Sequence, residues 1–303
     1  MPLIGFNHLY QFADGLRSAL SVVVAGGADP TVLEAMSLAQ RRGWVEPILT
    51  GNVHDTQRLA DDLNIDLSGF CLIESDEPAV AAVAAVKTGR AQMLMKGQIA
   101  TRLLMKAILA RDTGLRTDKS ICQVVMMEIL RDKRCFLLSD TGITIQPSLE
   151  QKADILRSLI EVATALREPS SLECPRIAVV SATEIATEAM PDTIDAVELT
   201  RRAVAGEFAH CVVQGPLSFD LAYAVDAGEK KKIDGSVVGS ADAMLFPDLL
   251  SANLTVKAIM YTANCCFGGI LCGTSCPVVF MSRADTTSTR LNSLAMSLRL
   301  LVR

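Results

Sequence analysis

The chain has few of the residues and motifs that metal, redox and nucleotide chemistry use most often. It contains three histidines, His8, His54 and His210, and no two of them form a metal-ligand motif with each other. It also lacks a P-loop and a GxGxxG dinucleotide fingerprint. These absences argue against a metal site, a tightly bound cofactor, nucleotide hydrolysis and dinucleotide redox chemistry.

Aromatic residues and an excess of basic charge are also scarce. Aromatic residues make up 4% of the 303-residue chain and hydrophobic residues 50%, so its cores must pack mainly aliphatic side chains, which suits layered α/β structure. The formal net charge of −5 gives no general attraction for nucleic acid or acidic membranes. An anionic substrate would therefore have to be bound by local basic residues.

Signals for secretion or membrane insertion are weak. The first ten residues have neither a basic start nor a sustained apolar segment, and the uncharged stretch 258–282 is broken by Asn264, Gly268, Gly269, Gly273 and Pro277. The nine cysteines are an odd number and most lie in apolar runs, without the paired spacing of a zinc site. We expect free thiols, a cytoplasmic protein and no membrane span.

Strand-like and helix-like segments alternate along almost the whole sequence. This alternation predicts α/β architecture. A helix between two strands forms a right-handed crossover that makes the strands parallel, so the sheets should be mainly parallel. Segments 122–129 and 134–138 are so close together that an antiparallel pair is an alternative there. Strands are expected at 21–25, 48–49, 70–73, 92–95, 177–180, 211–214, 243–246, 269–271 and 278–281, with helices at 30–42, 78–87, 99–109, 148–166, 193–208, 250–263 and 285–301.

The segment 277–294, PVVFMSRADTTSTRLNSL, carries the clearest functional signal. Its apolar run predicts a strand buried on both faces, and Ser282 and Arg283 follow the carboxyl end of that strand. Ligands bind at this edge of open parallel sheets, so the Arg283 guanidinium is placed for a phosphate or a developing oxyanion. A surface salt bridge for Arg283 and a turn role for Ser282 are the alternatives, and Asp285 or the threonines after it can cap the next helix.

Other polar residues also lie near predicted strand and helix ends. Lys96 and Gly97 close a buried strand before a helix, where glycine permits close backbone approach to a phosphate. Asn253 and Lys257 are four residues apart and share a helix face, but a cap and a surface lysine are equally compatible with this spacing. Further candidates are Thr101 and Lys106 on the helix after Gly97, and Asp140, which orients a cation or satisfies a turn.

Several motifs in register resemble the phosphate acyltransferases of the acetyl/butyryl type. They are Met95-Lys96-Gly97 with Thr101 and Leu104, Leu138-Ser139-Asp140, 146–150, 215–220, 239–242, 246–248 with Asn253 and Lys257, and Ser282-Arg283-Ala284-Asp285 with the basic residue and Leu-Asn-Ser that follow. This resemblance implies two three-layer αβα domains like those of isocitrate and isopropylmalate dehydrogenases. The turn-rich segment 140–147 then places the first domain at 1–142 plus 285–303 and the second at 143–284, with the active-site cleft between them.

The resemblance implies an enzyme that moves an acyl group between coenzyme A and inorganic phosphate. It implies acyl-CoA and phosphate as ligands, a homo-oligomer of at least two chains, and catalytic roles for Ser282, Arg283 and Asp285. Substrate-binding roles follow for Lys96, Gly97, Thr101, Lys106, Asp140, Asn253 and Lys257.

One position departs from the acetyl pattern. Acetyl-type relatives carry an aspartate where this chain has Thr289, whereas the form Ser-Arg-Ala-Asp is associated with butyryl-type relatives. We therefore expect a phosphate butyryltransferase-like activity with Asp285 as the base. The alternatives are a phosphate acetyltransferase and a non-catalytic acyl-CoA-sensing protein of the same fold.

Overall fold

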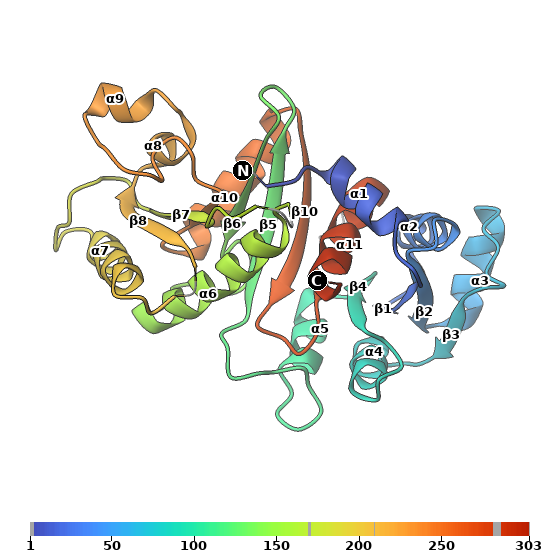
Figure 1. The fold of residues 1–303 in the computed structure, drawn as a ribbon. Helices are drawn as coiled ribbons and strands as arrows, with labels where there is room; N and C mark the ends of the chain where they lie inside the picture. Colours follow the sequence, from blue (N-terminus) through green and yellow to red (C-terminus); the bar gives the residue numbers. More distant parts are fainter. Residues whose placement is uncertain (1–2, 169–170, 209, 281–285, 303) are drawn as a thin grey trace. The chain divides into compact units, whose positions relative to one another are not determined.

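The computed structural model describes residues 3–168, 171–208, 210–280 and 286–302. Contacts divide the chain into two compact units. We call residues 1–5 with 120–266 the central unit, and residues 6–119 with 267–303 the terminal unit (Figure 1). Each unit contributes its own run of strands to the sheet order and has its own buried aliphatic core.

The terminal unit is a mostly parallel sheet with helices on both faces. Its strands lie in the order β3-β2-β1-β4-β11-β10, and only the β10–β11 pair is antiparallel. Helices α1, α2 and α11 lie on one face, and α4 and α5 on the other (Figure 1). The elements are α1 (Phe6–Asp14), β1 (Leu20–Ala25), α2 (Pro30–Arg41), β2 (Val45–Gly51), α3 (Val53–Asp62), β3 (Cys71–Glu74), α4 (Pro78–Lys87), β4 (Met93–Lys96), α5 (Thr101–Ile108), β10 (Cys265–Cys272), β11 (Val278–Val279) and α11 (Thr287–Leu301).

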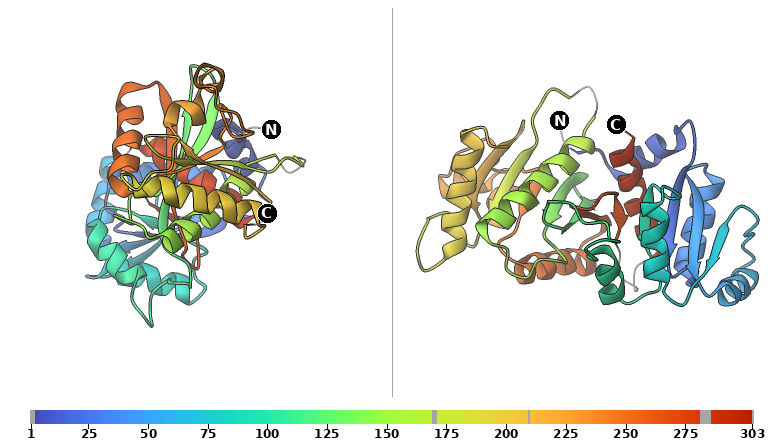
Figure 2. Two further views of the ribbon diagram at one scale, coloured as in Figure 1. Left: turned by 90° about the vertical axis from the view of Figure 1, so that its left-hand side faces the viewer. Right: turned by 90° about the horizontal axis from the view of Figure 1, so that it is seen from below.

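The central unit is also layered around a mainly parallel sheet. Its strands lie in the order β5-β6-β9-β7-β8, and the antiparallel alternative for the first two is confirmed. Helices α6 and α7 lie on one face, and α8 and α10 on the other (Figure 2). The elements are β5 (Cys122–Ile129), β6 (Arg134–Ser139), α6 (Leu149–Ala165), β7 (Arg176–Val180), α7 (Pro191–Val204), β8 (Val212–Leu217), α8 (Phe219–Tyr223), α9 (Ala227–Lys231), β9 (Ala243–Leu245) and α10 (Leu249–Thr262), and β10 starts in this unit.

The two compact units have different limits from the domains expected from sequence. The turn-rich loop after residue 139 placed a boundary at 142, but β5 and β6 form a hairpin and β6 pairs with β9, which ties residues 120–142 to the central unit. Residues 267–280 join the terminal unit because β11 pairs with β4. Helix α11 also packs in the terminal unit, against α1 and α2.

Local sequence signals explain how several helices begin. Asp29 caps α2 by accepting a hydrogen bond from the Val32 amide, and Pro30 occupies the first turn. At α6, Ser148 accepts from the Gln151 amide while the Gln151 side chain accepts from the Ser148 amide, which completes a capping box. These reciprocal bonds satisfy amides that the helix itself cannot pair.

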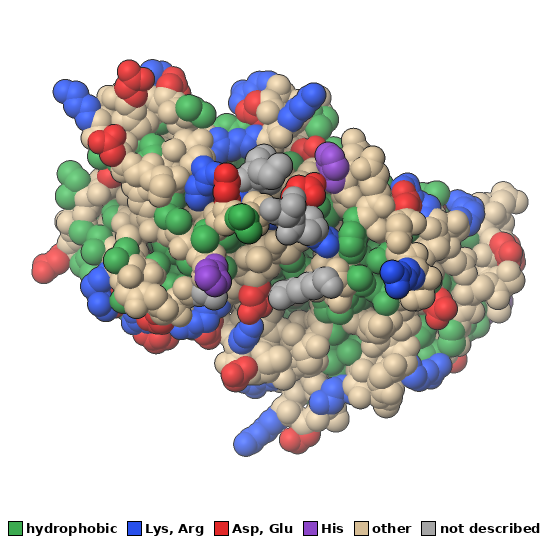
Figure 3. Space-filling view, in the orientation of Figure 1, with side chains coloured by type: hydrophobic (Ala, Val, Ile, Leu, Met, Phe, Trp, Pro, Cys, Tyr) green, Lys and Arg blue, Asp and Glu red, His purple; other side chains and the backbone are tan. Residues whose placement is uncertain are grey.

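Surface and hydropathy features agree with the composition. No helix within the described ranges has the length and apolar character needed to span a bilayer. On the face drawn in Figure 3, positive and negative side chains are interspersed rather than gathered in a patch of one sign. That distribution matches the small net charge of the chain.

A buried ion pair anchors the start of β9, and we expect its removal to destabilise the protein. Arg167 and Asp242 are 3% and 6% exposed at their side chains, and their charged atoms lie 2.7 Å apart. Asp242→Asn removes the buried carboxylate at 2.7 Å and leaves the guanidinium with the more exposed Glu173 carboxylate at 3.3 Å, so the free energy of unfolding should fall by about 3–5 kcal/mol. Thermal unfolding followed by circular dichroism measures this change.

The matched control is Asp226→Asn. Asp226 pairs with Lys230, but both side chains are mostly exposed. This substitution should cost at most about 0.5 kcal/mol. Equal melting temperatures for the two variants would show that the Arg167–Asp242 pair does not anchor β9.

Candidate functional site

Two glycine turns meet at the carboxyl edge of the terminal sheet. Strands β1 and β4 are parallel neighbours and end together, with Ala25 opposite Lys96. The Gly97 amide donates to the Ala25 carbonyl at 2.9 Å, and a Cβ atom at Gly97 would lie 2.0 Å from the Gly26 carbonyl oxygen. The close approach that requires glycine at this position is therefore to the chain's own backbone.

Lys96 and Arg290 bring two buried positive charges to this edge. Lys96 is 1% exposed and Arg290 is 0% exposed. The Arg290 guanidinium donates to the Lys96 carbonyl at 3.1 Å and to the Thr31 hydroxyl at 2.8 Å, and it lies 3.8 Å from the Asp29 carboxylate. Positive charge at the carboxyl ends of parallel strands suits an anionic ligand.

Arg290 is the member of this group whose position the sequence interpretation missed. In the sequence, Arg290 is the basic residue of the C-terminal motif, and the motif alone does not indicate that this side chain lies at the site. The available signal was a single arginine in the first turn of an otherwise uncharged helix start. The pattern did not reveal that this side chain reaches the end of β4, because that contact spans 194 residues.

The three expected catalytic residues, Ser282, Arg283 and Asp285, lie outside the described residues. Strand β11, which precedes them in the chain, is the parallel neighbour of β4. The helix that follows is capped by Thr286, whose hydroxyl accepts from the Thr289 amide at 3.3 Å. The N-cap role left open for Asp285 or a threonine is therefore taken by Thr286.

Asp140 holds together a loop in the central unit. It is 3% exposed, and its carboxylate accepts hydrogen bonds from the backbone amides of Gln123, Gly142, Ile143 and Thr144 at 2.7–3.2 Å. Its acceptor capacity is thus largely used within its own loop. Of the two roles left open by the sequence, the structure supports the one in which Asp140 satisfies turn amides.

Helix α10 packs its first half against this loop. Asp248 is the helix cap, and Asn253 donates through Nδ2 to the Thr141 carbonyl at 2.9 Å. Lys257 lies one turn further on and is exposed, with no ion pair to any residue that the structure describes. The structure therefore brings Asn253 to the 140–144 loop, while Lys257 lies further along the same helix.

Thr101 and Lys106 lie on α5 in the terminal unit. Both are exposed, and Thr101 is the first residue of the helix. Lys106 lines a cavity of about 450 Å³ between α4 and α5. The expected binding residues thus form one group around Lys96 and α5 and a second group around Asp140 and α10.

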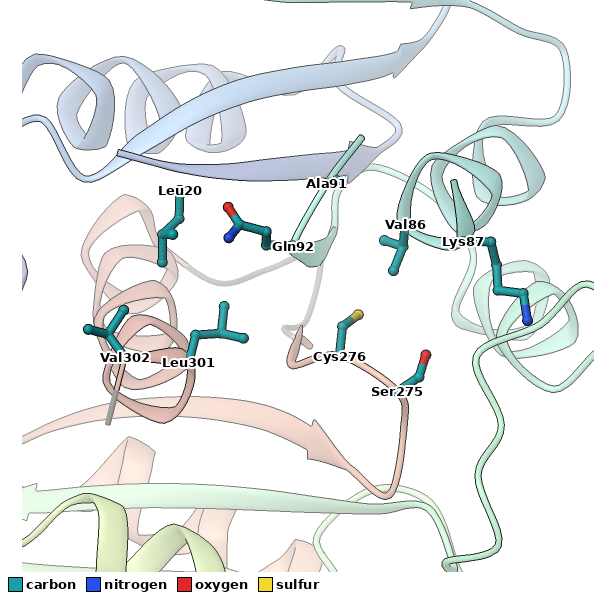
Figure 4. A pocket seen from close by; sticks show the side chains of 9 residues that line it. All are labelled: Leu20, Val86, Lys87, Ala91, Gln92, Ser275, Cys276, Leu301 and Val302. Atoms are coloured by element: carbon teal, nitrogen blue, oxygen red, sulfur yellow. The ribbon is translucent and has the colours of Figure 1, made fainter. Parts of the chain in front are cut away.

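A second cavity, of about 730 Å³, lies at the opposite edge of the terminal sheet, near the starts of β1 and β4 (Figure 4). Its lining includes Lys87, Gln92 and Cys276 among mainly apolar side chains. Burial raises the pKa of the Cys276 thiol to about 12, so this thiol is unreactive at neutral pH. This cavity holds no group suited to acyl transfer.

The described residues offer no metal centre, and Lys231 makes local contacts. The described part of the chain has no group of three or more metal-ligating side chains, and all nine cysteines are free. On α9, Lys231 donates to Ser218 at 2.8 Å and to Glu184 at 3.0 Å. The hydrogen bond from Ser218 and the neighbouring ammonium lower the pKa of Glu184.

The fold places the chain among the phosphotransacylases. The chain superposes on a branched-chain phosphotransacylase from Enterococcus faecalis with a TM-score of 0.81 and 30% identity, covering 94% of this chain and 99% of that one. A phosphotransacetylase from Streptococcus pyogenes, 20% identical, shares the fold with a TM-score of 0.82, covering 98% of both chains.

Sequence comparison then identifies the family. Residues 72–298 match the family described as "Phosphate acetyl/butaryl transferase". A phosphate butyryltransferase from Clostridium acetobutylicum is 35% identical over 91% of both chains, and a phosphate acetyltransferase from Thermotoga maritima is 35% identical over 95% of this chain and 97% of its own. The chain belongs to this family of phosphate acyltransferases, and the expected fold class is confirmed.

We expect Gly97→Ala to disrupt the contact between the two strand-end turns. The new Cβ would overlap the Gly26 carbonyl, so the terminal unit should lose about 1–3 kcal/mol of stability. Fluorescence of Trp44, the only tryptophan, reports unfolding of this unit in urea.

Gly15→Ala is the matched control for this substitution. A Cβ atom at Gly15 would meet its nearest neighbours at 3.5 Å, an ordinary contact. Its unfolding midpoint should stay close to that of the unchanged protein. If Gly97→Ala unfolds at the same urea concentration as Gly15→Ala, the turn tolerates a side chain and the proposed packing constraint is wrong.

Proposed function

We propose that this chain transfers an acyl group from coenzyme A to inorganic phosphate, forming acyl phosphate and free coenzyme A, with the preference of the butyryl type. The observation that carries the acyl transfer is the 35% identity to a phosphate butyryltransferase over 91% of the chain. Because a phosphate acetyltransferase is equally identical, the butyryl preference rests on the Ser-Arg-Ala-Asp form of residues 282–285. The 30% identical structural relative is a branched-chain phosphotransacylase, which also supports acyl groups larger than acetyl.

The reaction needs anion binding and stabilisation of an oxyanion. A phosphate oxygen attacks the thioester carbonyl carbon, negative charge develops on the carbonyl oxygen, and the carbon–sulfur bond then breaks. The sulfur leaves with the bonding electron pair and takes up a proton. Preorganised cations and hydrogen-bond donors aimed at the developing charge are the main source of rate enhancement in such a step.

We assign the direct roles to Arg283, Ser282 and Asp285. The Arg283 guanidinium binds two oxygens of phosphate or of the oxyanion at once, and the Ser282 hydroxyl donates to the same oxygens. Asp285 takes the proton from the coenzyme A thiol when the reaction runs towards acyl-CoA, and returns it to the leaving sulfur in the other direction.

The binding roles follow the two groups of described residues. Lys96, Gly97 and Thr101 lie at the strand edge that favours an anion, and Lys106 lies on the same helix as Thr101. In the central unit we assign Asn253 and Lys257 to a second set of substrate contacts. Asp140 acts on them indirectly, because it fixes the loop whose Thr141 carbonyl holds Asn253.

Coenzyme A and its acyl thioester are substrates in this proposal rather than bound cofactors. The cytoplasmic location and the homo-oligomer of at least two chains remain predictions. The oligomer is checked by the mass of the protein in solution.

The decisive experiment compares acyl-CoA thioesters at equal concentration. With phosphate present, the protein should release free thiol from butyryl-CoA faster than from propionyl-CoA and faster again than from acetyl-CoA. The control omits phosphate and should release little thiol. A preference for acetyl-CoA would make the chain a phosphate acetyltransferase, and binding of acyl-CoA without thiol release would support the sensing protein.

Two substitutions separate oxyanion binding from proton transfer. Arg283→Ala should lower kcat/KM by about 30- to 1,000-fold, which corresponds to about 2–4 kcal/mol of lost oxyanion stabilisation. Asp285→Asn should slow thiol attack on acyl phosphate at neutral pH, and the rate should recover at alkaline pH because the thiol then ionises without a base.

Arg58→Ala is the control for the loss of an arginine, because Arg58 is exposed and its ion pair among the described residues is with Asp55, three residues away. It should leave the rate unchanged. A folded Arg283→Ala protein with normal turnover removes Arg283 from the mechanism. An Asp285→Asn protein with an unchanged rate at neutral pH removes the base.

A further inference from the structure

An apolar cavity lies between α4 and α5, and its lining includes Ile99, which packs on the Gly26 turn. Its volume is about 450 Å³, within the range of small-molecule sites. Most of its lining is aliphatic, and three ionisable side chains, Asp76, Glu77 and Lys106, are among the lining residues. The aliphatic lining is formed by Pro78, Ala79, Val80, Val83, Ala84, Ile99, Leu103, Ala107 and Ala110.

Ile99 belongs both to the cavity lining and to the segment that follows Lys96. This residue follows Lys96 by three positions and is 8% exposed. Its Cγ2 atom lies 2.7 Å from where a Cβ at Gly26 would be, so Ile99 packs directly on the Gly26 turn. The same short segment that presents Lys96 at the end of β4 therefore also forms one wall of the cavity.

The lining specifies the chemistry of an occupant. Two side chains of the cavity, Val80 and Leu103, are 49% and 51% exposed, which leaves apolar surface in water. An alkyl chain would cover such surface without needing hydrogen-bond partners. Phosphate and carboxylate groups would instead remain near the turn or near Lys106, where donors are available.

We propose that this cavity receives the alkyl chain of the transferred acyl group and that its size makes the enzyme selective for straight and branched chains of four or more carbons. The proposal rests on the acyl transfer proposed above and adds the position that sets chain length. Ala84 and Leu103 are its specificity-determining residues, since they project from facing helices, α4 and α5.

The main test changes the cavity volume from both sides. Ala84→Leu fills the cavity from an exposed position of α4 that tolerates a strong helix former. It should lower the ratio of kcat/KM for butyryl-CoA to that for acetyl-CoA by at least about tenfold, because one methylene in an apolar pocket is worth about 10- to 200-fold. Leu103→Ala enlarges the cavity. It should raise the ratio of kcat/KM for hexanoyl-CoA to kcat/KM for butyryl-CoA.

Ala205→Leu is the control. Ala205 is exposed at the end of α7 in the central unit, so this variant should keep both ratios of the unchanged protein. The proposal is overturned if folded Ala84→Leu and Leu103→Ala proteins keep these ratios within twofold. If the variants change the oligomeric mass but keep the kcat/KM ratios, the cavity lies at a contact between copies of the chain. That result would also overturn the proposal.

A binding measurement keeps this inference distinct from the proposed reaction. The non-reactive thioether S-butyl-coenzyme A should bind more tightly than coenzyme A in calorimetry, and Ala84→Leu should abolish the difference. If the protein shows this pattern without thiol release, the cavity assignment stands and acyl transfer fails. If thiol release occurs but S-butyl-coenzyme A binds no more tightly than coenzyme A, the cavity assignment fails alone.

Discussion

The contact between Gly97 and the Gly26 carbonyl is the constraint on which the terminal unit's site depends. The ends of β1 and β4 approach so closely that no side chain fits between them. This contact fixes Lys96, which comes directly before the turn, and Ile99, which comes two residues after it. One backbone contact thus determines both where a buried cation lies and where one wall of the apolar cavity lies.

The two units bury charges of opposite sign, and these charges have different partners. In the terminal unit, Arg290 uses backbone and hydroxyl oxygens near Lys96, so positive charge is held at a strand edge where ligands bind. In the central unit, the Asp140 carboxylate is surrounded by backbone amides and stabilises a loop. Buried charge is costly unless it is hydrogen-bonded, and both arrangements meet that requirement. Only the first presents a cation at a ligand-binding edge.

Features set by neighbouring residues could be predicted from the sequence, whereas features set by distant pairings could not. The Asp29 cap and the strand before Lys96 depend on a few consecutive residues, and the structure has both. The unit boundaries depend on β11 joining β4 and on β6 joining β9, pairings between segments that are far apart in the chain. The reach of Arg290 to β4 is of the same kind. Motif order predicted the family because it does not require knowing these pairings.

The environment of Thr289 disfavours a carboxylate at this position of α11, which agrees with placing the proposed base before the helix. Thr289 is 4% exposed, its hydroxyl lies 3.0 Å from the Thr286 hydroxyl, and its carbonyl accepts from the Ser293 side chain. A hydroxyl satisfies this enclosed first turn, whereas a carboxylate would exchange a neutral hydrogen bond for a buried charge. The residue at this position therefore stabilises the helix start. In the sequence, the nearest carboxylate on the strand side of Thr286 is Asp285, the residue to which we assign the base in the proposed reaction.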